Sequence, residues 1–180
     1  MSIALTVCVG LAIASLIHAS PASALTPPYL LQSQDSRYKL CLEVAYASTD
    51  NGARIQQWPC DSGPAQLWYP IDKVVVDGVS YYGLLNANSS AGQPMCLEVP
   101  WGSPNAGQAL QLWDCLGAAR QLWSMDFVSG TDYRTLENLQ TKQCAEIPWN
   151  TPTAGAVVQQ WPCYGGEAQH WRFQMPAPIR

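Results

Sequence analysis

Six cysteines are the residues of this sequence whose spacing most directly implies chemistry. They form three pairs in which the second cysteine follows the first by 19 positions: Cys41 and Cys60, Cys96 and Cys115, and Cys144 and Cys163. The seventh cysteine, Cys8, lies in the N-terminal segment that is expected to be removed as a signal peptide, so the remaining number is even. An even number of cysteines in an exported chain is typical of disulfide bonds. The equal intervals predict one bridge within each of three units. Each bridge contributes about 3 kcal/mol of stability, because it restricts the unfolded chain.

Other chemistry for these residues finds little support. There is no Cys-x-x-Cys pair, and His170 is the only histidine after residue 24, which argues against a metal site. An enzyme needs a positioned acid, base or nucleophile, and no Gly-x-Ser-x-Gly segment is present. A two-carboxylate glycosidase is the alternative that stays open, because its acids are defined by their separation in space. The sequence predicts a non-catalytic protein with no cofactor and no metal.

The cysteines belong to a longer repeat. Each unit contains a Cys-Leu-Glu-Val-like segment, a Gln-x-Trp triplet before its second cysteine, and another Gln-x-Trp triplet ten residues further on. The offsets between the units fall in the range of supersecondary repeats. We expect three repeats, at about residues 28–70, 80–125 and 132–175. The six triplets end at Trp58 and Trp68, Trp113 and Trp123, and Trp161 and Trp171.

Short strands are the elements that must position these residues. Apolar and polar residues alternate over Leu40–Val44, which predicts a half-buried strand. Asp77-Gly78 lies between two apolar runs and suits a tight hairpin turn. No long amphipathic helical pattern occurs. A unit of short strands cannot bury its own apolar face, so the repeats must share one core. The sequence therefore predicts an all-β fold, a β-trefoil of three pseudo-threefold repeats.

The first 24 residues differ from the rest of the chain. They contain no charged residue, an apolar run over Ile3–Ile17, and a small-residue pattern at Ala22-Ser23-Ala24. These features predict a signal peptide over residues 1–24, with a membrane anchor or a lipoprotein anchor at Cys8 as alternatives. We expect the domain to cover residues 25–180 and to be secreted into the extracellular medium. No membrane association is expected after removal of the signal.

The net charge and the aromatic content of the chain indicate which classes of ligand it could bind. The formal net charge of −4 argues against nucleic acid, which needs a basic face. Eight Trp and eight Tyr stand against two Phe. Aromatic side chains with a polar group suit wet interfaces, so the composition favours a polar ligand. The 180 residues allow one compact domain, and we expect it to be a monomer.

These motifs resemble the ricin B-type (R-type) lectin domains, including the carbohydrate-binding modules of secreted microbial glycosidases. The resemblance covers about residues 28–175 and rests on the three Cys-Leu-Glu-Val-like segments, the equal cysteine intervals and the six Gln-x-Trp (QxW) triplets. The sequence of residues 51–58 resembles that of bacterial, actinomycete-type members of the family. The resemblance is to a stand-alone form of the domain. The resemblance implies a β-trefoil that binds carbohydrate by ring stacking and paired hydrogen bonds.

The family pattern assigns sugar-binding residues in each repeat: a carboxylate, a Gln, an aromatic ring, and a Gln that follows an Asn. The corresponding residues are Glu43, Gln56, Trp58 and Gln66; Glu98, Gln111, Trp113 and Gln121; and Glu146, Gln159, Trp161 and Gln169. Two features depart from the family: Glu replaces the usual Asp, and Ala65, Arg120 and Ala168 replace the Asn. Each missing charge-assisted hydrogen bond costs about 1.5–3 kcal/mol in a binding site. Because Glu, Gln and Trp persist in all three repeats, we expect altered rather than absent binding.

Several of these residues also have a structural interpretation. Trp68, Trp123 and Trp171 are expected in the core, and the second Gln of each repeat is suited to bonding backbone across a loop. Candidate stacking rings are Tyr46, Trp101 and Trp149; packing over the disulfide is their alternative. The resulting hypothesis is a lectin-like protein that binds polysaccharide or glycan weakly and multivalently. The alternative is a protein-binding or toxin-accessory trefoil with degenerate sugar sites.

Overall fold

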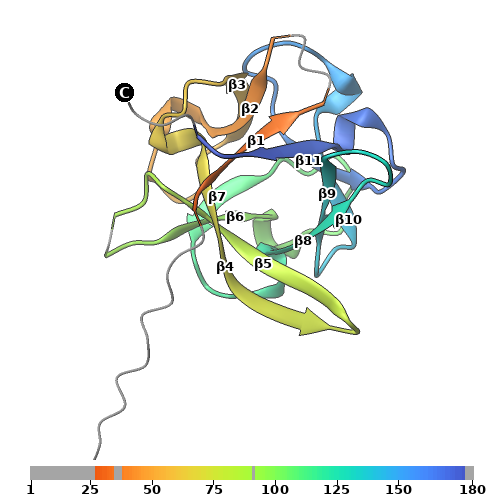
Figure 1. Cartoon of the computed structure of the whole chain (residues 1–180). Helices are drawn as coiled ribbons and strands as arrows, with labels where there is room; N and C mark the ends of the chain where they lie inside the picture. Colours follow the sequence, from red (N-terminus) through yellow and green to blue (C-terminus); the bar gives the residue numbers. More distant parts are fainter. Residues whose placement is uncertain (1–26, 35–37, 91, 177–180) are drawn as a thin grey trace, which may run out of the picture.

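A computed structural model describes residues 27–34, 38–90 and 92–176 as an all-β fold (Figure 1). The predicted signal peptide and Cys8 lie outside the described residues. The twelve described strands are β1 (Tyr29–Ser33), β2 (Leu40–Val44), β3 (Ile55–Pro59), β4 (Leu67–Val76), β5 (Val79–Asn86), β6 (Met95–Glu98), β7 (Gln111–Asp114), β8 (Leu122–Phe127), β9 (Tyr133–Asn138), β10 (Gln143–Glu146), β11 (Gln159–Pro162) and β12 (Trp171–Gln174).

Six of these strands close into a barrel. β1 pairs with β12 and β4, β5 pairs with β4 and β8, and β9 pairs with β8 and β12, all antiparallel. The other six form three hairpins, β2–β3, β6–β7 and β10–β11. Each repeat therefore contributes four strands, which confirms the predicted β-trefoil.

Two local predictions can be compared directly. The predicted turn joins β4 to β5 at Asp77 and Gly78, whose φ values of 50° and 81° suit a two-residue hairpin turn. The predicted strand is β2, but all five of its residues are buried, whereas the alternating pattern predicts a half-buried strand. Burial on both faces has a physical cause, because Cys41 forms a disulfide and the Glu43 carboxylate accepts hydrogen bonds from two amides.

Six short 3₁₀ helices connect the strands. Three follow the first strand of each hairpin: η1 (Ala45–Ala47), η3 (Pro100–Gly102) and η5 (Pro148–Asn150). The other three precede β4, β8 and β12: η2 (Pro64–Gln66), η4 (Ala119–Gln121) and η6 (Glu167–Gln169).

The three expected core tryptophans fill the interior of the barrel. Trp68, Trp123 and Trp171 are each 0% exposed. Each indole N–H also donates to a backbone carbonyl of its own repeat, which satisfies its polar atom inside the core. The acceptors are the oxygens of Leu42, Leu97 and Ala145, at 3.1, 3.2 and 3.1 Å.

A ring of backbone hydrogen bonds joins the three hairpins near the pseudo-threefold axis. Ile55 N donates to Leu110 O at 3.4 Å, Leu110 N to Val158 O at 2.9 Å, and Val158 N to Ile55 O at 3.0 Å. These three apolar residues are equivalent in the repeats and are buried. The hairpins are therefore held in one rigid body.

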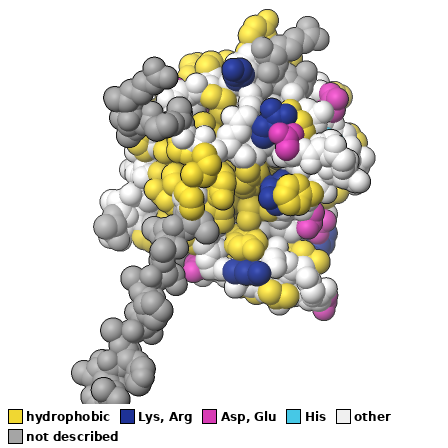
Figure 2. All heavy atoms as spheres, viewed as in Figure 1, with side chains coloured by type: hydrophobic (Ala, Val, Ile, Leu, Met, Phe, Trp, Pro, Cys, Tyr) yellow, Lys and Arg dark blue, Asp and Glu magenta, His cyan; other side chains and the backbone are white. Residues whose placement is uncertain are grey.

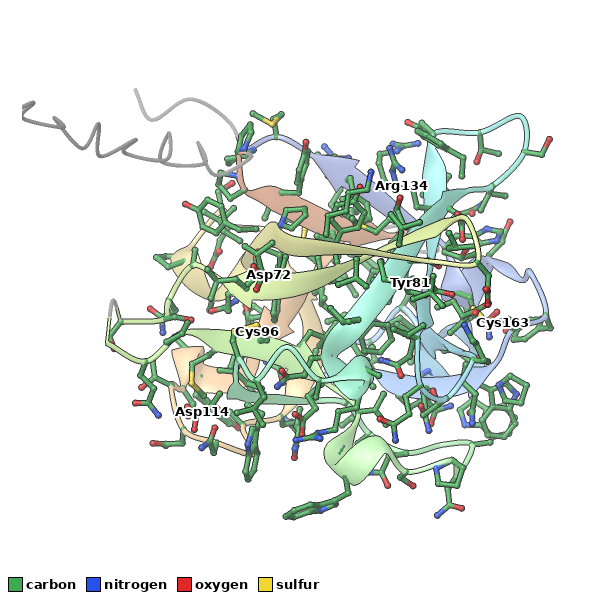
Figure 3. The ribbon with its side chains drawn as sticks, turned by 90° about the horizontal axis from the view of Figure 1, so that it is seen from below. Asp72, Tyr81, Cys96, Asp114, Arg134 and Cys163 are labelled. Carbon is green, nitrogen blue, oxygen red and sulfur yellow. A yellow bond between two sulfur atoms is a disulfide. The ribbon has the colours of Figure 1, made fainter. Side chains whose placement is uncertain are left out.

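The predicted disulfides are all present: Cys41–Cys60, Cys96–Cys115 and Cys144–Cys163. The first cysteine of each bridge lies on the strand that carries the repeat's glutamate, two residues before it, and the second cysteine follows the other strand of the hairpin. Figure 3 shows Cys96 and Cys163 on opposite sides of the molecule, in different hairpins.

A hollow of about 720 Å³ lies between the β4–β5 hairpin, β8, β9 and the two terminal strands. The Arg134 guanidinium stacks there, 3.6 Å from the centre of the Phe127 ring and 5.6 Å from that of Phe173. Figure 2 shows hydrophobic side chains gathered at the centre of the face that carries β4 and β5. In Figure 3, Arg134 lies at the end of the molecule opposite Asp114, which ends a hairpin strand.

Candidate functional site

Each predicted carboxylate lies on the first strand of a hairpin, directly opposite a glutamine of the second strand. The cross-strand partners are Glu43 and Gln56, Glu98 and Gln111, and Glu146 and Gln159. Directly opposed side chains of an antiparallel pair lie on the same face, close enough to bond. The glutamine Nε2 donates to the glutamate Oε1 at 2.9, 2.9 and 3.0 Å in the three repeats.

A second glutamine, at the end of a 3₁₀ helix, holds the other carboxylate oxygen. In the first repeat Gln66 Nε2 donates to Glu43 Oε2 at 2.7 Å and to Pro59 O at 2.9 Å, while its Oε1 accepts from Asp61 N at 2.9 Å. Gln121 and Gln169 make the same three bonds in their repeats, at 2.7–2.8 Å and at 3.0 Å.

The burial of these second glutamines determines what they can do. Gln66 and Gln169 are 0% exposed and Gln121 is 1% exposed. A buried amide cannot contact a ligand in this conformation, so it positions the carboxylate and the hairpin backbone. Each carboxylate accepts one amide on each oxygen, and an ionised carboxylate has further lone pairs. The network therefore holds each carboxylate in one position, with only 2–8% of the glutamate exposed.

The candidate stacking rings project into solvent. Tyr46, Trp101 and Trp149 are 92%, 83% and 96% exposed, so they do not pack over the disulfides. All three adopt the left-handed backbone conformation, with φ of 57°, 57° and 59°. Such a conformation costs a residue with a side chain about 1–2 kcal/mol. Strain and exposure that recur in all three copies point to a function for these rings.

In the first and third repeats the predicted residues meet in a hollow. The hollow in the first repeat has a volume of about 400 Å³. It is lined by Glu43, Tyr46, Arg54, Gln56, Trp58 and Gly155. The hollow in the third repeat has a volume of about 300 Å³. It is lined by Glu146, Trp149, Asn150, Gln159, Trp161 and Tyr164. The hairpin tryptophans Trp58 and Trp161 are 43% and 41% exposed, so each hollow presents two aromatic rings beside one carboxylate.

The second repeat carries the same residues in a different arrangement. The rings of Trp101 and half-buried Trp113 lie 6.0 Å apart at an angle of 56°. Arg120 Nε lies 3.1 Å from Glu98 Oε2. Among the described residues, no comparable ring contact or ion pair occurs at the corresponding positions of the other two repeats.

A neighbouring repeat contributes to the hollow of the first repeat. Gly155, in the third repeat, donates its N–H to Gln57 O of the first repeat at 2.8 Å. A Cβ at Gly155 would lie 3.6 Å from the Trp58 ring, and its φ of +84° favours glycine. Gly107 has the same relation to Trp161 in the third repeat, with its N–H on Gln160 O at 2.8 Å.

Four residues that line the hollows, Gly155 among them, were missed by the sequence reasoning. Arg54 Nη2 donates to Gln56 Oε1 at 2.8 Å, Asn150 ends η5, and Tyr164 follows the last cysteine. Partial desolvation, followed by the negative charge of Glu146 and a hydrogen bond to it, raises the pKa of Tyr164 above its ordinary value. An alignment of the three repeats gives each of these residues an equivalent position in the other two. At three of the four positions the residue type differs between repeats, as with Asp61, Leu116 and Tyr164 directly after the second cysteine, and this variation is the only sequence signal for them.

In the part of the chain that the structure describes, no group of three or more His, Cys, Asp or Glu could hold a metal ion. Nor does that part contain a helix long and apolar enough to cross a membrane.

Family models match the chain over most of its length. The model of the ricin-type beta-trefoil lectin domain matches residues 86–180, and the model of the ricin-type beta-trefoil lectin domain-like family matches residues 23–113. No curated protein matches the chain.

Solved structures of the same fold are similar to this chain. A designed threefold-symmetric protein, ThreeFoil, is 27% identical, with a TM-score of 0.71 over 81% of this chain and 96% of its own. An exo-β-1,3-galactanase from Clostridium thermocellum is also 27% identical, with a TM-score of 0.73 over 84% of this chain but only 30% of the enzyme. The C-terminal half of an earthworm R-type lectin in complex with GalNAc shares the fold at 18% identity and a TM-score of 0.59, over 84% of this chain and 100% of its own.

Proposed function

Because the chain belongs to the ricin-type β-trefoil lectin family, we propose that it is a secreted, non-catalytic protein that binds polysaccharide or glycan through copies of one site. The observation that carries this proposal is the pairing of exposed rings with a held carboxylate. Aromatic faces stack on the apolar C–H face of a sugar, and a fixed carboxylate accepts bonds from its hydroxyls.

Multivalent binding follows from the rigid arrangement of the repeats. A shallow hollow makes few contacts with a hydrated sugar, so the affinity of a single site is low. Several sites on one body bind a polymer or branched glycan more tightly, provided that the ligand spans them. The three disulfides are typical of a protein that folds in an oxidising compartment, which supports secretion.

The carboxylates support a binding role over a hydrolytic one. Glycosidases use two acids with different environments and roles. Here Glu43, Glu98 and Glu146 are copies of one position, and each has both of its oxygens held by amides. The galactanase relative is consistent with a binding module, because this chain covers only 30% of that enzyme.

A protein-binding or toxin-accessory role is the second candidate. Alanine at positions 65 and 168 removes a polar group from the sites, which favours degenerate sugar binding. A mosquitocidal holotoxin shares the fold at 12% identity, and this chain covers 17% of it. Glycan binding distinguishes the two candidates.

The test replaces the exposed rings, since they contribute little to the fold. The triple variant Tyr46→Ala, Trp101→Ala, Trp149→Ala should lose retention on insoluble polysaccharides and on a glycan array. Its thermal unfolding should change little, because these side chains are 83–96% exposed. The glutamates are a less specific target, since their removal leaves buried amides without acceptors.

Phe127→Ala is the matched control, because Phe127 is 66% exposed but lies at the other end of the barrel. The control variant should be retained like the wild type, and free sugar should compete. Wild-type protein that binds no glycan, or a triple variant with unchanged retention, would refute the proposal.

A further inference from the structure

The second repeat differs from the other two at one position in the site. Arg120 lies on η4 where the first and third repeats have Ala65 and Ala168. Its Nε lies 3.1 Å from Glu98 Oε2, the carboxylate oxygen that also accepts from Gln121 Nε2 at 2.8 Å. The difference therefore alters the acceptor that defines the site.

Arg120 neutralises the charge of its carboxylate. The Glu98 side chain is only 3% exposed, and the Arg120 guanidinium lies against it. A negatively charged ligand is repelled by a lone carboxylate, but not by one that is paired with an arginine. The first repeat also has an arginine, but Arg54 Nη2 donates to Gln56 Oε1, and no ion pair joins Arg54 to Glu43.

The guanidinium is held in place while its donors stay available. The backbone carbonyl of Arg120 accepts from Val99 N at 3.1 Å and from Asn138 Nδ2 at 3.0 Å, which fixes the start of the side chain. The buried Nε has no aligned hydrogen-bond acceptor among the described residues, and the side chain is 27% exposed. No terminal NH₂ group of Arg120 is hydrogen-bonded to the described part of the chain. A guanidinium in this state suits a planar carboxylate, which it binds through two parallel bonds.

The 3₁₀ helix that carries Trp101 packs against the one that carries Arg120. η3 contacts η4, and Val99, just before η3, donates its N–H to Arg120 O at 3.1 Å. The Trp101 ring contacts the Trp113 ring at 6.0 Å, a contact that the equivalent rings of the other two repeats do not make in the described part of the chain. The second repeat therefore has an indole surface on the element next to its cation, a combination that suits a charged sugar.

We propose that the site of the second repeat binds an acidic saccharide, a hexuronic acid residue whose carboxylate pairs with Arg120 and whose ring stacks on Trp101. This inference rests on the proposed carbohydrate-binding function and adds a ligand class for one site.

The experiment compares two probes and three proteins. Methyl glucuronide and methyl glucoside are titrated into wild-type protein, Arg120→Ala and Lys73→Ala, with binding measured by calorimetry and by the indole N–H resonances. Arg120→Ala gives the second repeat the residue type of the other two, so it should fold. Lys73→Ala is the control, because it removes the same charge from an exposed residue of β4.

The wild type should bind the glucuronide with a shift of the Trp101 and Trp113 indole resonances. Arg120→Ala should weaken that binding about tenfold, the expected effect of losing a charge-assisted pair. Binding of the neutral glucoside should not weaken, and Lys73→Ala should behave like the wild type.

Two outcomes overturn the inference alone: neutral sugars bind but the glucuronide does not, or Lys73→Ala weakens glucuronide binding as much as Arg120→Ala. The first outcome leaves the proposed function intact, and the second attributes the selectivity to overall charge. If neither probe binds and the protein is not retained on any polysaccharide, the proposed function itself fails.

Discussion

Replacing Gln169 with leucine tests whether the buried amides hold the site and the fold together. Gln169 is 0% exposed and makes three bonds: to Glu146 Oε2, to Pro162 O and from Tyr164 N, each at 3.0 Å. Leucine has a similar volume, so Gln169→Leu removes the hydrogen bonds with little change in packing. It leaves a buried carboxylate oxygen, a carbonyl and an N–H without these partners.

The magnitude follows from the three bonds. A bond to a charged acceptor contributes about 1.5–3 kcal/mol and each neutral bond about 0.5–1.5 kcal/mol. The expected loss in the free energy of unfolding is therefore about 2.5–6 kcal/mol, out of a total of roughly 5–15 kcal/mol for a typical domain. For a chain of this size, that loss lowers the melting temperature by about 10 °C.

Gln159→Leu is the matched control within the same repeat. Gln159 Nε2 makes one bond, to the other oxygen of the same carboxylate at 3.0 Å, and its side chain is half-buried. We expect it to lose only about 1–2 kcal/mol of stability. Both variants release one oxygen of Glu146, so both should weaken sugar binding at the third repeat.

Urea denaturation gives the free energies, and titration with the best glycan ligand gives the affinities. The reasoning is wrong if Gln169→Leu loses less than about 1 kcal/mol, or if the two variants lose the same amount. Because Gln66 and Gln121 make the same three bonds, Gln66→Leu and Gln121→Leu should reproduce the result.

Two further predictions concern stability. Burial lowers the pKa of His170 below its ordinary value of 6.5, so the unfolded chain takes up a proton that the folded protein excludes, and stability falls as the pH drops below 6.5. His170→Leu, which matches Leu67 and Leu122, should make the melting temperature fall less between pH 7.5 and pH 5; parallel decreases would contradict this. The double variant Cys144→Ser, Cys163→Ser should lose about 3 kcal/mol in urea denaturation, because the unfolded chain regains the entropy of a closed loop. A loss below about 1 kcal/mol would show that this bridge contributes little.

Much of the architecture could be predicted from the sequence because the repeat carries it. The equal cysteine intervals predicted the pairing, the position of Trp68 and its copies predicted the core, and Asp77-Gly78 predicted a turn. Each of these features depends on local spacing, which the chain displays directly. The prediction that the strand Leu40–Val44 exposes one polar face was wrong. That face is buried because Glu43 is bonded by Gln56 and Gln66, which come from other elements.

The residues of the candidate site could be predicted from the sequence, but which of them are exposed to a ligand and which are buried could not. Glu43 and Gln56 lie opposite each other because they occupy neighbouring strands of one hairpin, a relation that the repeat pattern implies. Whether Gln66 contacts ligand or backbone depends on its burial, and the exposure of Tyr46 depends on a left-handed turn. Neither property has a sequence signal of its own.

The sequence by itself determined that three copies of a disulfide-bonded β-unit repeat along the chain, each with a carboxylate, two amides and aromatic rings. Only the tertiary structure decided which of those groups face a ligand and how the copies differ. Closure of the barrel brings Gly155 of the third repeat against Trp58 of the first, and it packs Arg120 against Glu98. Such contacts join residues from different repeats or elements, and their proximity follows from the packing of the whole barrel rather than from spacing along the chain.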